Sequence, residues 1–237
     1  MNTLQTLKQW IQESKHIVFF GGAGVSTESG IPDFRSVDGL YNQKFDYLPE
    51  QIISHSFFDK DPAYFFRFYR EKMLPLGFEP NVTHLKLAQW EREGKLDAVI
   101  TQNIDGLHQK AGSQRVFELH GSVLRNYCVN CGKFFSAEYI KNHPNIPRCD
   151  CGGIVKPDVV LYEEALNANV LDESIHVIQN ADLLIVAGTS LTVYPAAGLL
   201  RYYSGHRLVL INRDATPYDS YASLVFHENL GNIFSQI

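Results

Sequence analysis

The sequence predicts an α/β protein built on a doubly wound parallel sheet with two insertions. Four short apolar runs, each followed by a polar or Gly-rich turn, have the pattern of parallel strands buried on both faces; they are 17–20, 98–101, 181–187 and 207–211. Helical periods lie between them, for example at 82–93 and 171–179. Alternation of strand and helix is typical of a doubly wound sheet.

Two stretches break this alternation and define the insertions. Residues 36–75 are rich in aromatic side chains and are predicted to form a helical insertion. Residues 125–155 contain all four cysteines and form the second insertion. An amphipathic helix is expected at 3–14, ahead of the first strand. Ligands of such sheets bind at the carboxyl ends of the strands, so the turns that follow the strands are the candidate site.

Composition limits the class of protein. The chain has 237 residues, of which 45% are apolar, which fits one large domain or one domain plus a small module and excludes a disordered chain. The net charge of −5 argues against nucleic-acid binding through bulk charge. No secretory signal opens the sequence and no apolar run approaches the length of a membrane span. We therefore expect a cytoplasmic protein with no membrane or direct nucleic-acid partner.

The first strand is followed by a Gly-rich turn, Gly21–Thr27. Glycines there let backbone N–H groups approach a phosphate, although a plain tight turn has the same composition. Thr27 stands where the dinucleotide fingerprint has its third glycine, and the acidic residue about 20 positions on is missing, which disfavours a dehydrogenase. The next segment, Gly30–Ser36, is either a ligand-covering loop with Phe34 and Arg35 or a surface turn.

Polar side chains also follow the later strands. Gln102, Asn103 and Asp105 come directly after the second strand, where they can bind a polar ligand, cap a helix, or do both. Further candidates for ribose contacts, which are also ordinary turn residues, are Thr189, Ser190, Asn212 and Arg213. A lone histidine is usually structural, but His120 is distinguished by its position beside a glycine and just before the cysteine insertion, where a cleft between domains would open.

The four cysteines have the spacing of a zinc site. They are Cys128, Cys131, Cys149 and Cys151. Four thiolates fill the tetrahedral shell of zinc, so the ion would be structural and would hold a module too small for its own core. A disulfide pair and a redox switch are the alternatives, and the Cys-x-Cys spacing of the second pair is shorter than usual.

Taken together and in order, these segments resemble the sirtuins, the NAD-dependent protein deacylases. The resemblance rests on G-A-G-V-S, G-I-P-D-F-R-S, T-Q-N-I-D-G-L-H, the H-G pair, the four cysteines, V-V-L-Y-E-E, G-T-S-L-T-V and I-N-R-D. It implies a Rossmann-like NAD-binding domain from 1–35, 76–124 and 156–237, with a small domain made of 36–75 and a zinc module at 125–155. It also implies a monomeric protein lysine deacetylase that consumes NAD, carries one structural zinc ion, and acts on acetyl-lysine proteins or peptides.

The resemblance also implies residue roles. His120 would be the general base, and the NAD site would be lined by Ala23, Thr27, Phe34, Arg35, Gln102, Asn103, Ile104, Asp105, His120, Thr189, Ser190, Asn212, Arg213 and Leu230. Val160 would pack on the acyl-lysine, and Val159–Glu163 with Thr189–Val193 would pair with the peptide backbone. The zinc ligands would be the four cysteines. In this family the acyl oxygen attacks C1′ of the nicotinamide ribose, and the bond from C1′ to nicotinamide breaks as nicotinamide leaves.

Two features of this chain bear on its substrates. The stretch that usually ends in Gly-Glu ends here in Glu163-Glu164, and the added charge is predicted to favour peptides with basic flanks. Members that remove succinyl groups carry a Tyr-x-x-Arg pair, where this chain has Phe66 and Tyr69. Neighbouring Arg67 and Arg70 are predicted to point elsewhere, because one helical position turns a side chain by about 100°.

Three other classes of function compete with a deacetylase. ADP-ribosyl transfer to protein would use the same NAD site and would leave ADP-ribose on the target. A zinc-ribbon interaction module would need no NAD, and the full set of strand-end motifs argues against it. A dehydrogenase is disfavoured by the incomplete fingerprint described above.

Overall fold

The computed structural model describes residues 3–33 and 45–237 and confirms the α/β class. A six-stranded parallel sheet has the order β3-β2-β1-β7-β8-β9, which is the order of a Rossmann-like sheet. Its strands are β1 (Ile17–Gly21), β2 (Leu96–Thr101), β3 (Val116–Glu118), β7 (Leu183–Ala187), β8 (Leu208–Ile211) and β9 (Leu224–Phe226). The four expected strands are present, and β3 and β9 extend the two edges.

Helices cover both faces of this sheet, as a doubly wound fold requires. Alternate residues of β1 point to opposite faces, so Phe19 packs against α1, α5 and α9 whereas Phe20 packs against α8 and η5. These helices are α1 (Thr3–Glu13), α5 (Val82–Arg92), α8 (Ala168–Asn180), η5 (Ala196–Tyr202) and α9 (Leu230–Phe234). Short helices complete the large domain: η1 (Ala23–Val25), η2 (Thr27–Ser29), α6 (Leu107–Ala111) and η6 (Asp219–Tyr221).

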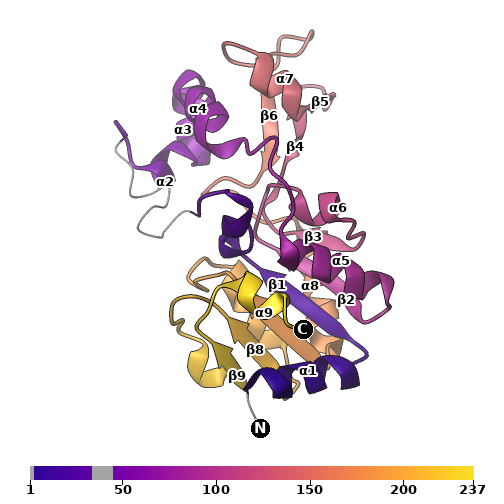
Figure 1. Ribbon diagram of the computed structural model, residues 1–237. Coiled ribbons are helices and arrows are strands. Elements are labelled where there is room, and N and C mark those ends of the chain that lie inside the picture. The colour runs from indigo at the N-terminus through magenta and orange to yellow at the C-terminus, as the bar shows by residue number, and fades with distance from the viewer. Residues whose placement is uncertain (1–2, 34–44) are drawn as a thin grey trace.

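The two insertions come together as one small domain, at the top of Figure 1. The first is helical, with α2 (Pro49–Ile52), α3 (His55–Lys60), α4 (Pro62–Phe68) and the π-helical η4 (Tyr69–Met73). The second has a three-stranded antiparallel sheet and a helix: β4 (Gly121–Cys128), β5 (Phe134–Ser136), α7 (Ala137–Asn142) and β6 (Val155–Val159). One apolar core joins them and contains Phe65, Phe66, Val155 and the zinc-module residues Cys128 and Cys149.

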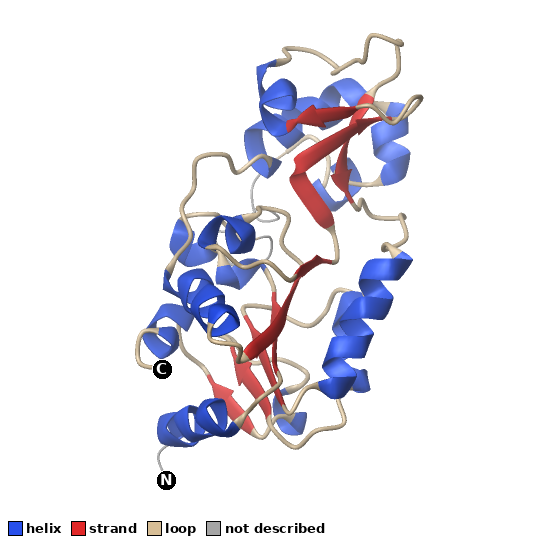
Figure 2. Ribbon diagram, turned by 90° about the vertical axis from the view of Figure 1, so that its right-hand side faces the viewer, coloured by secondary structure: helices blue, strands red, loops and turns tan. Residues whose placement is uncertain are grey.

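The small sheet extends beyond the expected insertion at 125–155. β4 begins at Gly121 and β6 ends at Val159, so both strands run from the zinc module to the large sheet. Figure 2 shows the strands of the small domain above the large sheet, with which they form no common sheet. His120 and Val160 therefore lie at the two ends of the second insertion, where the chain passes between the domains. Among the described residues, no helix combines the length and apolar character needed to cross a membrane.

Candidate functional site

A cleft with a cavity of about 480 Å³ lies where the two domains meet. It opens at the carboxyl ends of β1 and β7, the neighbouring strands at which the strand order reverses, and this is where α/β sheets bind their ligands. Of the NAD and substrate residues expected from the sequence, the cleft is lined by Ala23, Thr27, Gln102, Asn103, Ile104, Asp105, His120, Val160, Thr189, Ser190, Val193, Asn212, Arg213 and Leu230. Phe34 and Arg35 lie outside the described residues.

The Gly-rich turn after β1 packs directly on the turn after β7. The backbone N–H of Gly24 donates to the carbonyl of Gly188 at 2.8 Å. A Cβ atom on Gly22 would lie 2.7 Å from Cβ of Thr189, and one on Gly24 would lie 2.7 Å from Cα of Gly188. Glycine is therefore required here for the close approach of two chain segments, and this approach forms the floor of the cleft.

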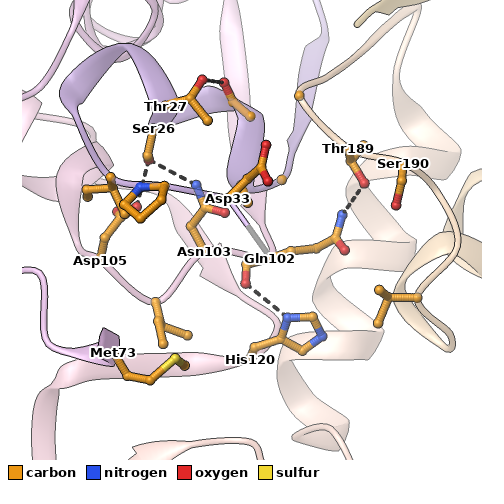
Figure 3. Close-up of a pocket in the computed structure, with 18 of the residues that line it drawn as sticks. Ser26, Thr27, Asp33, Met73, Gln102, Asn103, Asp105, His120, Thr189 and Ser190 are labelled. Atoms are coloured by element: carbon orange, nitrogen blue, oxygen red, sulfur yellow. Dashed lines mark hydrogen bonds between the residues drawn. The ribbon is translucent and has the colours of Figure 1, made fainter. Parts of the chain in front are cut away.

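Three polar side chains form a network on one wall of the cleft (Figure 3). Ser26 Oγ donates to Asp105 at 2.7 Å, and Asn103 Nδ2 donates to Ser26 Oγ at 3.1 Å. Burial raises the pKa of Asp105, against the lowering effect of hydrogen bonds from the Leu107 backbone N–H and from Ser26. The network fixes an amide, a hydroxyl and a carboxyl group, which suits recognition of a polar ligand.

A second set of hydrogen bonds connects the ends of β2, β7 and β8. Gln102 Nε2 donates to Thr189 Oγ1 at 2.9 Å, and the Thr189 backbone N–H donates to Asn212 Oδ1 at 2.8 Å. These side chains follow three different strands and meet only because parallel strands end at the same edge of the sheet. Figure 3 shows Gln102 lying between Thr189 and His120.

His120 is held in one orientation beside these groups. Its Nδ1 lies 2.9 Å from the Gln102 carbonyl oxygen. Because a carbonyl oxygen only accepts, Nδ1 carries the hydrogen and Nε2 is left as the atom that accepts a proton. Burial lowers the pKa of His120, partly opposed by the bond to Gln102, so the ring is neutral at pH 7. A fixed neutral imidazole in a cleft is suited to general-base chemistry.

Val160 and Val193 line the cleft from different segments of the chain. The Val160 backbone N–H donates to the His120 carbonyl at 3.0 Å, which places the end of β6 beside the histidine. Val193 follows the β7 turn and precedes η5. Both valines line the same cleft as His120.

The four cysteines lie together at the far end of the small domain. Their sulfur atoms all lie within 4.8 Å of one another, with Cys128 and Cys151 at 3.4 Å and Cys131 and Cys149 at 3.6 Å. Sulfur atoms about 2.3 Å from a tetrahedral zinc ion lie about 3.8 Å apart, so the donor set fits zinc. The cluster does not line the cleft, which suits a structural ion.

The cleft also contains residues that the sequence did not single out for it. Lys72 and Met73 reach it from η4, and Glu28 and Asp33 reach it from the segment after the Gly-rich turn. Ser26 lies within the Gly-rich turn Gly21–Thr27, and its hydroxyl group at a strand end could have marked it as a residue of the site. Lys72 and Met73 carried no signal, because the aromatic insertion has no motif that shows which of its residues face the cleft.

Comparison with known proteins gives a consistent result over the whole chain. The model of the Sir2 family matches residues 22–195. An NAD-dependent protein deacetylase of Clostridium acetobutylicum is 56% identical, covering 100% of this chain and 98% of the relative. An enzyme of the same description from Cutibacterium acnes is 54% identical, over 99% of this chain and 97% of the relative.

Solved structures agree with the sequence matches. A Sir2 structure with a deacetylated p53 peptide and 3'-O-acetyl-ADP-ribose superimposes with a TM-score of 0.91 at 38% identity, covering 98% of this chain and 96% of the other. A Sir2 structure with a p53 peptide and NAD⁺ gives a TM-score of 0.87 at 38% identity, with the same coverage. The sheet order, the cleft and the full-length similarity all lead to one assignment: the chain belongs to the Sir2 family.

Proposed function

We propose that this protein is an NAD-dependent protein lysine deacetylase, which transfers the acetyl group of acetyl-lysine to ADP-ribose and releases nicotinamide, O-acetyl-ADP-ribose and free lysine. The observation that carries the proposal is the placement of His120. Its accepting Nε2 stands in a cleft walled by the polar turns of β1, β2, β7 and β8. Full-length relatives that are described as NAD-dependent protein deacetylases support the same activity.

NAD fits the polar half of the cleft. The Gly-rich turn with Ala23 and Thr27 would hold its phosphates, and Asn103, Ile104 and Asp105 would hold nicotinamide and its ribose, with Gln102 nearby. The adenosine half would contact Thr189, Ser190, Asn212, Arg213 and Leu230. Bound there, NAD supplies an electrophilic ribose carbon whose nicotinamide can leave. Phe34 and Arg35 stay predicted contributors to this site.

His120 would handle the proton in this chemistry. Its Nδ1–H is fixed on the Gln102 carbonyl, so Nε2 takes up a proton from a ribose hydroxyl brought into the cleft. The lowered pKa keeps Nε2 unprotonated at neutral pH. Asp105, held by Ser26, would orient the ribose rather than exchange protons, because both of its oxygens already accept hydrogen bonds.

The acyl-lysine peptide would lie in the cleft between Val160 and Val193. The backbone of Val159–Glu163 and of Thr189–Val193 would pair with an extended peptide, which is strand addition at an open edge. Val160 would contact the lysine stem beside His120. The zinc ion would be held by Cys128, Cys131, Cys149 and Cys151 and would stabilise the small domain. Monomeric state and cytoplasmic location stay predictions from the sequence.

Incubation of the protein with NAD and an acetyl-lysine peptide tests the proposal. We expect nicotinamide, O-acetyl-ADP-ribose and deacetylated peptide in equal amounts by mass spectrometry. His120→Ala should lower the rate by about 10²–10⁴-fold while NAD binding by calorimetry persists. ADP-ribose retained on the peptide would instead indicate ADP-ribosyl transfer, and a rate loss below about tenfold would show that His120 is not the base.

A further inference from the structure

The segment that leaves β6 forms one wall of the cleft and contains an unusual backbone conformation. Val160, Tyr162 and Glu163 all line the cleft. Glu163 has φ of 76°, in the left-handed region that normally favours glycine. Among the described residues, Leu191 at φ 56° is the other non-glycine residue with positive φ. Such strained positions persist only where the surroundings hold them.

The Glu163 side chain is held by the helical insertion. Its Oε2 accepts hydrogen bonds from the Ser56 backbone N–H at 2.9 Å and from Ser56 Oγ at 2.5 Å. Ser56 lies in the first turn of α3, where backbone N–H groups have no partner within the helix. Bonds to an ionised carboxylate are stronger than bonds between neutral groups. With this backbone conformation, the Glu163 carboxylate is bonded to the first turn of α3.

Backbone pairing brings the same two segments together. The His55 N–H donates to the Tyr162 carbonyl at 3.0 Å, and the Tyr162 N–H donates to the Ile53 carbonyl at 3.0 Å. We call the paired segments Ile53–Ser56 and Tyr162–Glu164 the clasp. The clasp connects the cleft wall to α3, and α3 itself is packed into the small-domain core through Phe57 and Phe58.

Glu164 completes the clasp from the other side. Its Oε2 accepts from the Leu161 backbone N–H at 2.9 Å and pairs with Lys156 at 3.1 Å, while its Oε1 lies 2.8 Å from His55 Nδ1. The carboxylates of Glu163 and Glu164 are thus both bonded within the protein. The Glu163 carboxylate is bonded to Ser56. The main effect of this side chain is therefore to hold Tyr162–Glu164, which form the wall of the cleft, in place.

From this arrangement we infer that Glu163 is a positioning residue for the acyl-lysine peptide: its bonds to Ser56 fix Tyr162–Glu164 against α3 in the conformation that the peptide pairs with. Because the clasp already orders this segment, less conformational entropy is lost when the peptide binds to it. The affinity for the peptide should therefore depend on the clasp. NAD would contact the other half of the cleft, so the affinity for NAD should not depend on the clasp. The inference rests on the proposed function, in which Val160 and the adjoining backbone contact the peptide.

Steady-state kinetics of the full zinc-bound chain test this role. Glu163→Ala, which keeps the strained backbone and loses the carboxylate, should raise the peptide KM by about fivefold or more, with kcat and the NAD KM within about twofold of the parent. Glu163→Gln keeps an acceptor oxygen and should restore the peptide KM to within about twofold. Glu138→Ala removes an exposed glutamate from the same domain, away from the cleft, and should change nothing.

Glu163→Gly is a second variant in case Glu163→Ala folds poorly. Glycine adopts the left-handed backbone without strain and also removes the carboxylate. The same increase in peptide KM is expected with this variant. Each variant is assayed with matched Lys-flanked and Glu-flanked peptides. An equal increase for both peptides supports positioning. An increase confined to the Lys-flanked peptide would overturn it in favour of direct charge recognition, and so would an unchanged KM in both Glu163→Ala and Glu163→Gly.

Val160→Ala separates this proposal from the proposed function. If the peptide KM rises for Val160→Ala and stays unchanged for the Glu163 variants, the peptide site stands and the positioning role fails. If none of these variants changes the peptide KM while deacetylation persists, the peptide does not use this wall. The assignment of the wall and the role of Glu163 would then both be wrong, with the deacetylase activity unaffected.

Discussion

The Nδ1 of His120 lies 2.9 Å from the carbonyl oxygen of Gln102, so a residue at the start of the small domain is oriented by the end of a large-domain strand. The bond does two things. It selects the tautomer that leaves Nε2 to accept a proton, and it restricts the ring to one direction in the cleft. The geometry of the base therefore depends on how the two domains meet.

The pH dependence of deacetylation should report this histidine. Burial lowers the pKa of His120 below the usual 6.5, and the Gln102 bond opposes only part of that shift. The neutral base is lost as pH falls through the lowered pKa, so kcat/KM should keep more than half of its maximum at pH 6.5 and decline below it. An acid limb with its midpoint above 6.5, in a protein that still binds NAD, would contradict the assignment.

Removal of one zinc ligand should lower zinc content and stability together. Cys128 is 2% exposed and belongs to the small-domain core, so Cys128→Ala leaves both a broken metal site and a cavity. Metal-binding energy in small modules is largely folding energy, and a loss of several kcal/mol is expected. Metal analysis and thermal unfolding provide the measurement, with Glu138→Ala as the control. A zinc-free Cys128→Ala protein of parental stability and activity would refute the structural role.

Stability should fall on mild acidification because of a buried histidine pair. The rings of His84 and His108 are fully buried, with centroids 4.7 Å apart. Burial lowers the pKa of His84 to about 4 and also lowers that of His108, with the neighbouring ring adding to the effect. Below pH 6.5 the unfolded chain binds protons that the native protein does not, so stability is lost as pH falls from 6.5 towards 4. His84 alone accounts for about 2 kcal/mol by pH 5.

Urea unfolding at pH 7 and pH 5 measures this loss. His84→Gln is the matched variant, because a glutamine oxygen can still accept from the Asn81 backbone N–H that His84 Nδ1 now caps, and glutamine does not titrate. We expect the variant to lose less stability than the parent between the two pH values. An identical loss in both proteins would assign the acid sensitivity to other groups.

The acyl preference should be for acetyl over succinyl groups. Phe66 is buried in the small-domain core, Tyr69 lines the cleft, and neither side chain carries a charge. Arg67 stacks on Tyr64 and Arg70 bonds to the carbonyls of Asn145 and Pro144, so both are engaged elsewhere, as the helical spacing predicted. Burying a carboxylate without a cationic partner costs several kcal/mol, and even about 3 kcal/mol lowers kcat/KM more than a hundredfold.

Kinetics on one peptide scaffold with either acyl group decide this point. The structure adds one cation to consider, because Lys72 lines the cleft while its ammonium pairs with Glu71 at 3.0 Å. Comparable kcat/KM for acetyl and succinyl would contradict the prediction. Loss of the succinyl activity in Lys72→Ala would then identify that lysine as the carboxylate partner.

The four inner strands of the large sheet and the position of the cleft at their carboxyl ends could be predicted from the amino-acid sequence, whereas the edge strands β3 and β9 were not predicted. Strands such as Ile17–Gly21 are fully buried, so an unbroken apolar run marks them, and the turn after each strand lies at the carboxyl edge whatever the strand order. Local pattern marked Gly22, Asn103 and Thr189 as candidates at the strand ends, and the resemblance to the sirtuins combined these segments into one predicted site. The cysteine spacing likewise indicated zinc, because the ligands of such a module come from short, nearby segments.

Contacts between residues of distant segments became visible in the folded chain and could not be predicted from local patterns. The clasp between Ser56 and Glu163, the contact of His84 with His108, and the reach of Lys72 into the cleft join residues that no local pattern relates. A sequence pattern records the periodicity of burial along one element. The rotation and partner of that element are fixed by packing of the whole chain, because each of those contacts needs both segments in place at once.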